Sequence, residues 1–173
     1  MRPELTVVLA AALCACSSND EPPREHVKLA SLGFDVPASW KRTDVARRGV
    51  ATAVWQPEDN DRKESITVIR SELSPAVAQA GAAGIEPYLA AAQRALPHVH
   101  PSRVKRFTTA TGIEGARVEL DFIPPGQHET YRRVHVVLVD GSSLVHVLYT
   151  AKQPDRAQTA LRVVLDNLHH EEA

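Results

Sequence analysis

The sequence predicts an α+β domain in which short strands, a helical region, further strands and a C-terminal helix follow one another. Three observations support this prediction. Apolar and charged residues alternate through residues 113–123, which is typical of a strand with one face in a core. Two apolar runs, residues 131–139 and 143–150, are joined by Asp140-Gly141, a strong signal for a β-hairpin. The chain then ends in an apolar stripe at helical spacing, formed by Ala157, Leu161, Val164, Leu165 and Leu168.

The strands can be placed along the chain from the same patterns. The hairpin at residues 131–150 is apolar on both faces, so we expect it inside the sheet with cover on both sides. Residues 26–36 contain two short apolar runs that end in a turn at residues 37–40. The remaining predicted strands are residues 50–55, 65–70 and 103–110.

The helical region begins at Ser74-Pro75, because serine is a good N-cap and proline suits the first turn of a helix. Gly81 and Gly84 weaken its first part, since each costs about 1 kcal/mol against alanine inside a helix. Pro87 then opens a firmer helix over residues 88–96.

The C-terminal helix is predicted to begin at Gln153-Pro154-Asp155. Proline is favoured at the first helical position, and an aspartate there is stabilised by the helix dipole. The last residues of the chain, two histidines followed by two glutamates, are expected to fray away from the domain.

The first twenty residues resemble the signal of a bacterial lipoprotein. Residues 5–15 are apolar but too short for a membrane span, which needs about 20 apolar residues. Leu13-Cys14-Ala15-Cys16 resembles a lipobox, in which a small residue precedes the cysteine that is acylated. The small Ala15 precedes Cys16, whereas the bulky Leu13 precedes Cys14. We therefore predict cleavage between Ala15 and Cys16 and lipid attachment at Cys16.

This signal divides the chain into a signal peptide (1–15), a flexible tether (16–25) and a single domain (26–170). The tether is polar, charged and rich in proline, a composition that cannot bury a core. The alternative is an ordinary secreted protein in which Cys16 is a free thiol or is removed. Both cysteines lie in the signal segment, so no disulfide is expected in the domain. If the bacterium has two membranes, Ser17 resembles a signal for the outer membrane.

Composition and motifs exclude several classes of function. A net charge of −1 offers no basic field for nucleic acid, which is therefore not an expected partner. The sequence contains no G-x-S-x-G or G-x-G-x-x-G motif, so we expect neither an enzyme nor a cofactor. Glu119 and Asp121 share a strand face, but their alternation with apolar residues indicates a solvated surface rather than a catalytic pair.

His135 and His146 are the most notable ionisable pair. If Asp140-Gly141 is a two-residue turn, His135 lies directly opposite His146, and a longer loop leaves them diagonal neighbours on one face. Two histidines can begin a metal site, and His128 in the preceding loop is a third, weak candidate ligand. Zinc takes three or four ligands, so the favoured interpretation is a structural pair, and no metal is assigned.

Residues 34–40, Phe-Asp-Val-Pro-Ala-Ser-Trp, are similar to the opening of PsbP-like domains, a fold shared by bacterial lipoproteins of the DcrB type. Residues 149–154 resemble the end of the same pattern, so the resemblance spans about residues 27–168. It implies an α/β/α sandwich in which an antiparallel sheet of about six to seven strands is flanked by two main helices. It also implies binding or assembly rather than catalysis, and it carries over no catalytic residue.

We therefore expect a non-enzymatic envelope lipoprotein, held to a membrane by its lipid, that binds or assembles with an envelope protein. The alternative is a periplasmic lipoprotein that binds a metal or small ligand through its strand histidines.

Overall fold

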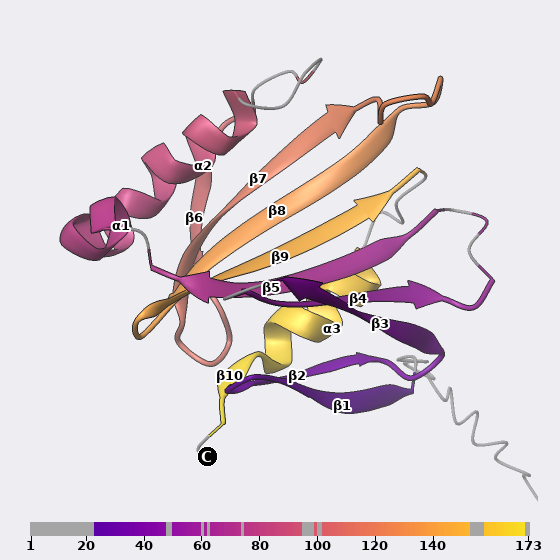
Figure 1. Ribbon diagram of the computed structural model, residues 1–173, viewed down its shortest axis with the longest axis horizontal. Coiled ribbons are helices and arrows are strands. Elements are labelled where there is room, and N and C mark those ends of the chain that lie inside the picture. Colours follow the sequence, from indigo (N-terminus) through magenta and orange to yellow (C-terminus); the bar gives the residue numbers. More distant parts are fainter. Residues whose placement is uncertain are drawn as a thin grey trace, which may run out of the picture.

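The computed structural model describes residues 23–47, 50–59, 61, 63–73, 75–94, 99, 102–152 and 158–171. These residues form two antiparallel sheets with helices packed around them (Figure 1). In chain order the elements are β1 (Arg24–Leu29), β2 (Leu32–Pro37), β3 (Trp40–Arg47), β4 (Val50–Pro57), β5 (Ser65–Glu72), α1 (Pro75–Ala80), the 3-10 helix η1 (Gly81–Gly84), α2 (Ile85–Arg94), β6 (Lys105–Thr108), β7 (Glu114–Phe122), β8 (Tyr131–Asp140), β9 (Ser143–Ala151), α3 (Thr159–Asn167) and β10 (His169–His170).

The larger sheet has seven strands in the order β3-β4-β5-β9-β8-β7-β6, and each neighbouring pair is antiparallel. β8 and β9 lie inside this sheet, and most of their side chains are buried whichever face they occupy. This confirms the position predicted from the two apolar faces of the hairpin. It also confirms the predicted number of strands.

One face of the larger sheet is covered by α3 and by the β1-β2 hairpin. Leu161 and Val164 of α3 pack in one buried cluster with Phe34 of β2 and Trp55 of β4. The rings of Phe34 and Trp55 meet edge to face, with their centroids 5.3 Å apart. Fully burying a leucine or phenylalanine side chain contributes about 1.5–3 kcal/mol, so this cluster fastens the hairpin and α3 to the larger sheet.

The opposite face is covered by α2, which packs over β7 and β8. Ile85 and Leu89 of the helix lie in a second buried cluster with Val118 and Val137. The helix begins three residues before the predicted start, so Pro87 lies in its first turn, where its missing N–H has no partner to lose. Helices on both faces of the sheet confirm the predicted α/β/α sandwich.

Two strands correct the sequence-based expectations. β3 begins at the last residue of the turn predicted at residues 37–40 and continues to Arg47, where no strand was predicted. β10 pairs with the free edge of β2, whereas the C-terminal residues were predicted to fray. The backbone N–H of Glu171 also donates to the Ser31 carbonyl, at 2.8 Å. The prediction of fraying was wrong because β10 completes a second sheet, in the order β1-β2-β10.

The ends of the domain also differ in detail. β1 begins at Arg24, two residues inside the predicted tether. The predicted start of the last helix falls on residues 153–157, outside the described residues, and α3 follows Gln158, which has a φ of 50°. The predicted signal peptide also lies outside them. None of the helices in the described ranges is long and apolar enough to cross a membrane.

Candidate functional site

The β8–β9 turn sets the relative position of the two predicted histidines. Asp140 pairs with Ser143, so the two-residue turn is Gly141-Ser142 rather than Asp140-Gly141. Gly141 occupies its first position with a φ of 57°, a left-handed value that glycine adopts without steric cost. This shift of one residue makes His135 and His146 diagonal neighbours. The prediction that His135 lies directly opposite His146 was therefore wrong, and the alternative that they are diagonal neighbours on one face is confirmed.

The two histidines contact each other on the face of the sheet that α2 covers. His135 Nε2 lies 3.0 Å from His146 Nδ1, and the rings are stacked with centroids 5.3 Å apart. Tyr88 of α2 meets the His146 ring edge to face, at 5.7 Å between centroids. His146 is buried and His135 is half-buried. The pair therefore lies at the margin of the helix.

Burial keeps both rings neutral. The pKa of His135 is lowered to about 3, first by burial and then by the positive charges of His146 and Arg133. Burial also lowers the pKa of His146. Near pH 7 one neutral ring therefore donates its N–H to the unprotonated nitrogen of the other.

His128 does not join this pair as the predicted third ligand. It is exposed in the loop between β7 and β8. Among the residues that the structure describes, no other histidine, cysteine, aspartate or glutamate completes a group of three ligand atoms around His135 and His146. The alternative interpretation, a metal site that uses His135 and His146, stays a prediction.

A shallow apolar groove of about 280 Å³ adjoins the histidine pair on the same face of the sheet. Ile69 lines this groove and lies directly opposite His146 across β5 and β9. Val45 on the terminal strand β3 is 36% exposed. The residues that line the groove are Val45, Val50, Thr52, Val54, Thr67 and Ile69.

The groove is open because the helices cover only part of this face. α2 contacts β7 and β8, and Figure 1 shows α1 and α2 beside that half of the sheet and away from β3 and β4. The groove residues of β3, β4 and β5 are therefore half-buried or exposed and are not covered by these helices.

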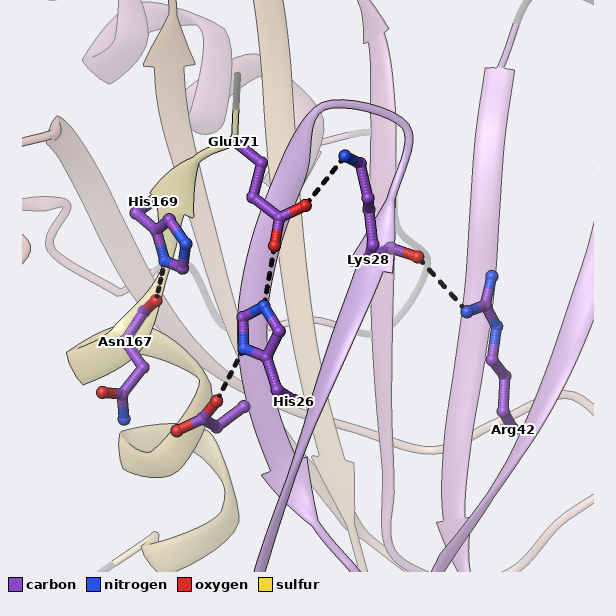
Figure 2. A network of polar contacts seen from close by, with 7 residues as sticks. His26, Lys28, Arg42, Asn167, His169 and Glu171 are labelled. Atoms are coloured by element: carbon purple, nitrogen blue, oxygen red, sulfur yellow. Dashed lines mark hydrogen bonds and ion pairs between the residues drawn. The ribbon is translucent and has the colours of Figure 1, made fainter. Parts of the chain in front are cut away.

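A second polar cluster joins the two ends of the domain (Figure 2). His26 on β1 makes a hydrogen bond of 2.7 Å through Nε2 to Glu171 Oε1, and one of 2.9 Å through Nδ1 to Asp35 Oδ1. The other oxygen of Glu171 lies 2.9 Å from Lys28 Nζ. The ring of His169 stacks on that of His26, with centroids 5.6 Å apart.

These contacts favour the charged forms of the two central groups. Hydrogen bonds from His26 and Lys28 lower the pKa of Glu171 to about 2. The hydrogen bonds of His26 to Glu171 and Asp35 raise its pKa in turn. This cluster was not predicted from the sequence, because the C-terminal histidines were expected to fray. A local signal was the alternation in β1, which places His26 and Lys28 on the face opposite the buried Val27 and Leu29.

The other candidate residues from the sequence either form ion pairs or lie outside the described residues. Arg117 Nη2 donates to Glu119 at 2.7 Å, and Arg132 makes two hydrogen bonds to Asp121 at 2.9 and 3.1 Å. Their ion pairs on the strand surface agree with the predicted solvated face. The predicted lipid-attachment residue Cys16 and the preceding Ala15 lie outside the described residues.

No protein-family model matches the chain, and no curated protein matches it. Solved structures do. The protein is similar to cyanobacterial PsbP (CyanoP) from Synechocystis sp. PCC 6803, with a TM-score of 0.55 and 16% identity over 91% of this chain and 98% of that one. The fold is PsbP-like.

Two further structures share this PsbP-like fold. LpqN of Mycobacterium tuberculosis, described as involved in cell envelope biogenesis, has a TM-score of 0.59 and 16% identity over 87% of this chain and 91% of that one. A Bacteroides thetaiotaomicron protein has a TM-score of 0.59 and 11% identity over 88% of this chain. The chain spans about half of that protein, 49% of its length. At these identities the likeness concerns the fold alone.

Proposed function

We propose that this protein is a non-enzymatic envelope lipoprotein that binds another envelope protein through the open apolar face of its larger sheet. The lipobox pattern at residues 13–16 supports the lipid anchor at Cys16 and a place at the outer membrane if the cell has two membranes. The shared fold of LpqN, a protein of cell envelope biogenesis, supports the envelope role.

The groove beside β3 is the main structural support for the proposed binding role. Its lining residues are valine, threonine and isoleucine, which make it apolar. The terminal strand β3 borders it, and a partner can add main-chain hydrogen bonds along such an edge. These features favour a protein partner with apolar side chains.

The short length of the predicted tether favours a partner that lies close to the membrane. Seven residues separate Cys16 from Arg24, where β1 begins. The eight intervals from Cys16 to Arg24 span at most about 29 Å even when fully extended. A lipid on Cys16 would therefore keep the domain within reach of membrane proteins and of proteins close to the membrane surface.

The test is site-specific photo-crosslinking in the native envelope. A photoreactive residue at Val45, in the groove, is expected to give one specific cross-linked envelope protein. The matched position is Arg162, which is exposed on α3 on the opposite side of the sheet, and it is expected not to capture that protein. Equal yields from both positions, or no product from position 45, would overturn the proposal.

Val45→Asp provides an independent measurement. It places a charge in the groove at an exposed position, so the melting temperature is expected to stay unchanged. Recovery of the partner after chemical cross-linking is expected to fall about tenfold, because a charge at an apolar contact costs roughly 1.4 kcal/mol or more of binding free energy. Arg162→Asp is the control and should leave recovery unchanged.

A further inference from the structure

We propose that His26, His169 and Glu171 form a binding site for a transition-metal ion of the zinc class that joins the first and last strands of the domain. One nitrogen of each histidine and one carboxylate oxygen all lie within 4.8 Å of one another. Imidazole and carboxylate ligands bind zinc at about 2.0–2.2 Å, which separates tetrahedral ligand atoms by roughly 3.3 Å. Small side-chain rotations would bring these three atoms to that spacing.

The pairing of the smaller sheet places the three side chains on one face. β1 and β10 flank β2, and His169 lies directly opposite Gly33. His26 lies opposite Asp35, two residues further along β2, so it shares that face. The alternate residues of β1 point into the core. The site is therefore built by strand pairing rather than by a loose terminus.

Gly33 provides the space in which the ligands meet. A Cβ atom there would lie 2.7 Å from Glu171 Oε1 and 2.8 Å from His169 Nε2. These distances are shorter than van der Waals contact, so a side chain on residue 33 would push both ligands away from β2. The absence of a side chain at Gly33 thus lets Glu171 and His169 lie directly against the backbone of β2.

Both rings are held in an orientation that suits a metal. His169 Nδ1 donates to the Asn167 carbonyl at 2.7 Å, which leaves His169 Nε2 unprotonated as a ligand atom. His26 Nδ1 is bonded to Asp35, which directs His26 Nε2 toward Glu171. Metal-binding histidines commonly use one ring nitrogen for a carboxylate or carbonyl and the other for the metal. Figure 2 shows the labelled rings beside Glu171.

The fourth position of a tetrahedral ion would be open. Lys28 holds the second oxygen of Glu171, so Oε1 is the oxygen available to the ion. Three protein ligands and one open position for water are the usual arrangement of accessible zinc sites. Since His26 is exposed, this position faces solvent. An ion there would connect residues 145 positions apart in the chain.

The test uses the full-length chain without an affinity tag and with Cys14 and Cys16 replaced by serine, so that thiols do not bind zinc. Calorimetric titration with zinc chloride is expected to show one ion per chain. The melting temperature is expected to rise by about 5–10 °C at a zinc concentration a hundred times the dissociation constant. Magnesium chloride is the control salt and should cause neither effect.

Matched variants locate the site. His26→Ala and His169→Ala are each expected to abolish stoichiometric binding, and His128→Ala, at an exposed loop histidine, should leave it unchanged. Asp35→Asn removes an orienting partner and should weaken the affinity about tenfold. Gly33→Ala should weaken it as well, while circular dichroism shows that the fold is kept.

Two results would overturn the proposal. One is a wild-type chain that binds no zinc. The other is zinc binding that survives His26→Ala and His169→Ala, including the case in which it is lost only in His135→Ala.

Discussion

Replacing Cys16 by serine is expected to abolish acylation of the chain and to leave an unprocessed precursor. Serine has no thiol to receive the lipid. Mass spectrometry of the purified protein would show an unprocessed chain without fatty acid.

Cys14→Ser is the matched control, because it changes the neighbouring thiol and keeps Ala15-Cys16 intact. This variant should carry the same mass of lipid as the wild type. Fatty acid on the Cys16→Ser chain, or its loss from the Cys14→Ser chain, would contradict the assignment of Cys16.

Acid is expected to destabilise the domain through the buried histidine pair. The pKa of His135 falls from its usual 6.5 to about 3 in the fold, so the unfolded chain binds the extra proton below pH 6.5. This contribution to stability is present above pH 6.5 and is lost as the pH falls toward 3. Each pH unit below 6.5 lowers the free energy of unfolding by about 1.4 kcal/mol through this one proton. The loss amounts to about 4 kcal/mol at pH 3.5.

The measurement is urea denaturation of the wild type and of His135→Leu between pH 7 and pH 4. The variant should lose stability with pH less steeply, by about 1.4 kcal/mol per unit, because it has no proton to take up at this position. Comparison of the two chains removes the contribution of the carboxylates, which titrate in both. His128→Leu, at an exposed histidine, is the control for the loss of a histidine from the chain. Identical slopes in all three proteins would show that His135 is not held neutral.

Alternation of apolar residues predicted the strands that border the core. β7 carries this pattern because one of its faces is turned to solvent, whereas β8 and β9 were predicted from apolar residues on both faces, which are both covered. β3 carries no such pattern. Its inward face bears Arg42, whose guanidinium lies 5.5 Å from the centroid of the Trp55 ring, and Asp44, which pairs with Arg42. A strand at the edge of a sheet can have charged residues on both faces. Its sequence then lacks the apolar alternation that predicts a strand and resembles a loop.

The two histidine clusters differ in how far sequence reasoning can reach. His135 and His146 belong to one hairpin, so counting from the turn brings them together and errs only by the one-residue position of the turn. His26 and Glu171 meet across 145 residues. Their contact depends on the two-residue strand β10, which is too short to show a periodic pattern. Tertiary pairing alone creates that cluster.

The position of β1 decides how the domain would respond to mechanical load. If Cys16 carries the lipid, tension between the membrane and the domain is applied at Arg24, at the open end of the β1–β2 ladder. Pulling there peels the ladder one pair at a time toward Leu29, rather than shearing all of its pairs together. Val27 would leave the core first, followed by Leu29. The hairpin is thus the part of the fold that yields first to a pull from the membrane.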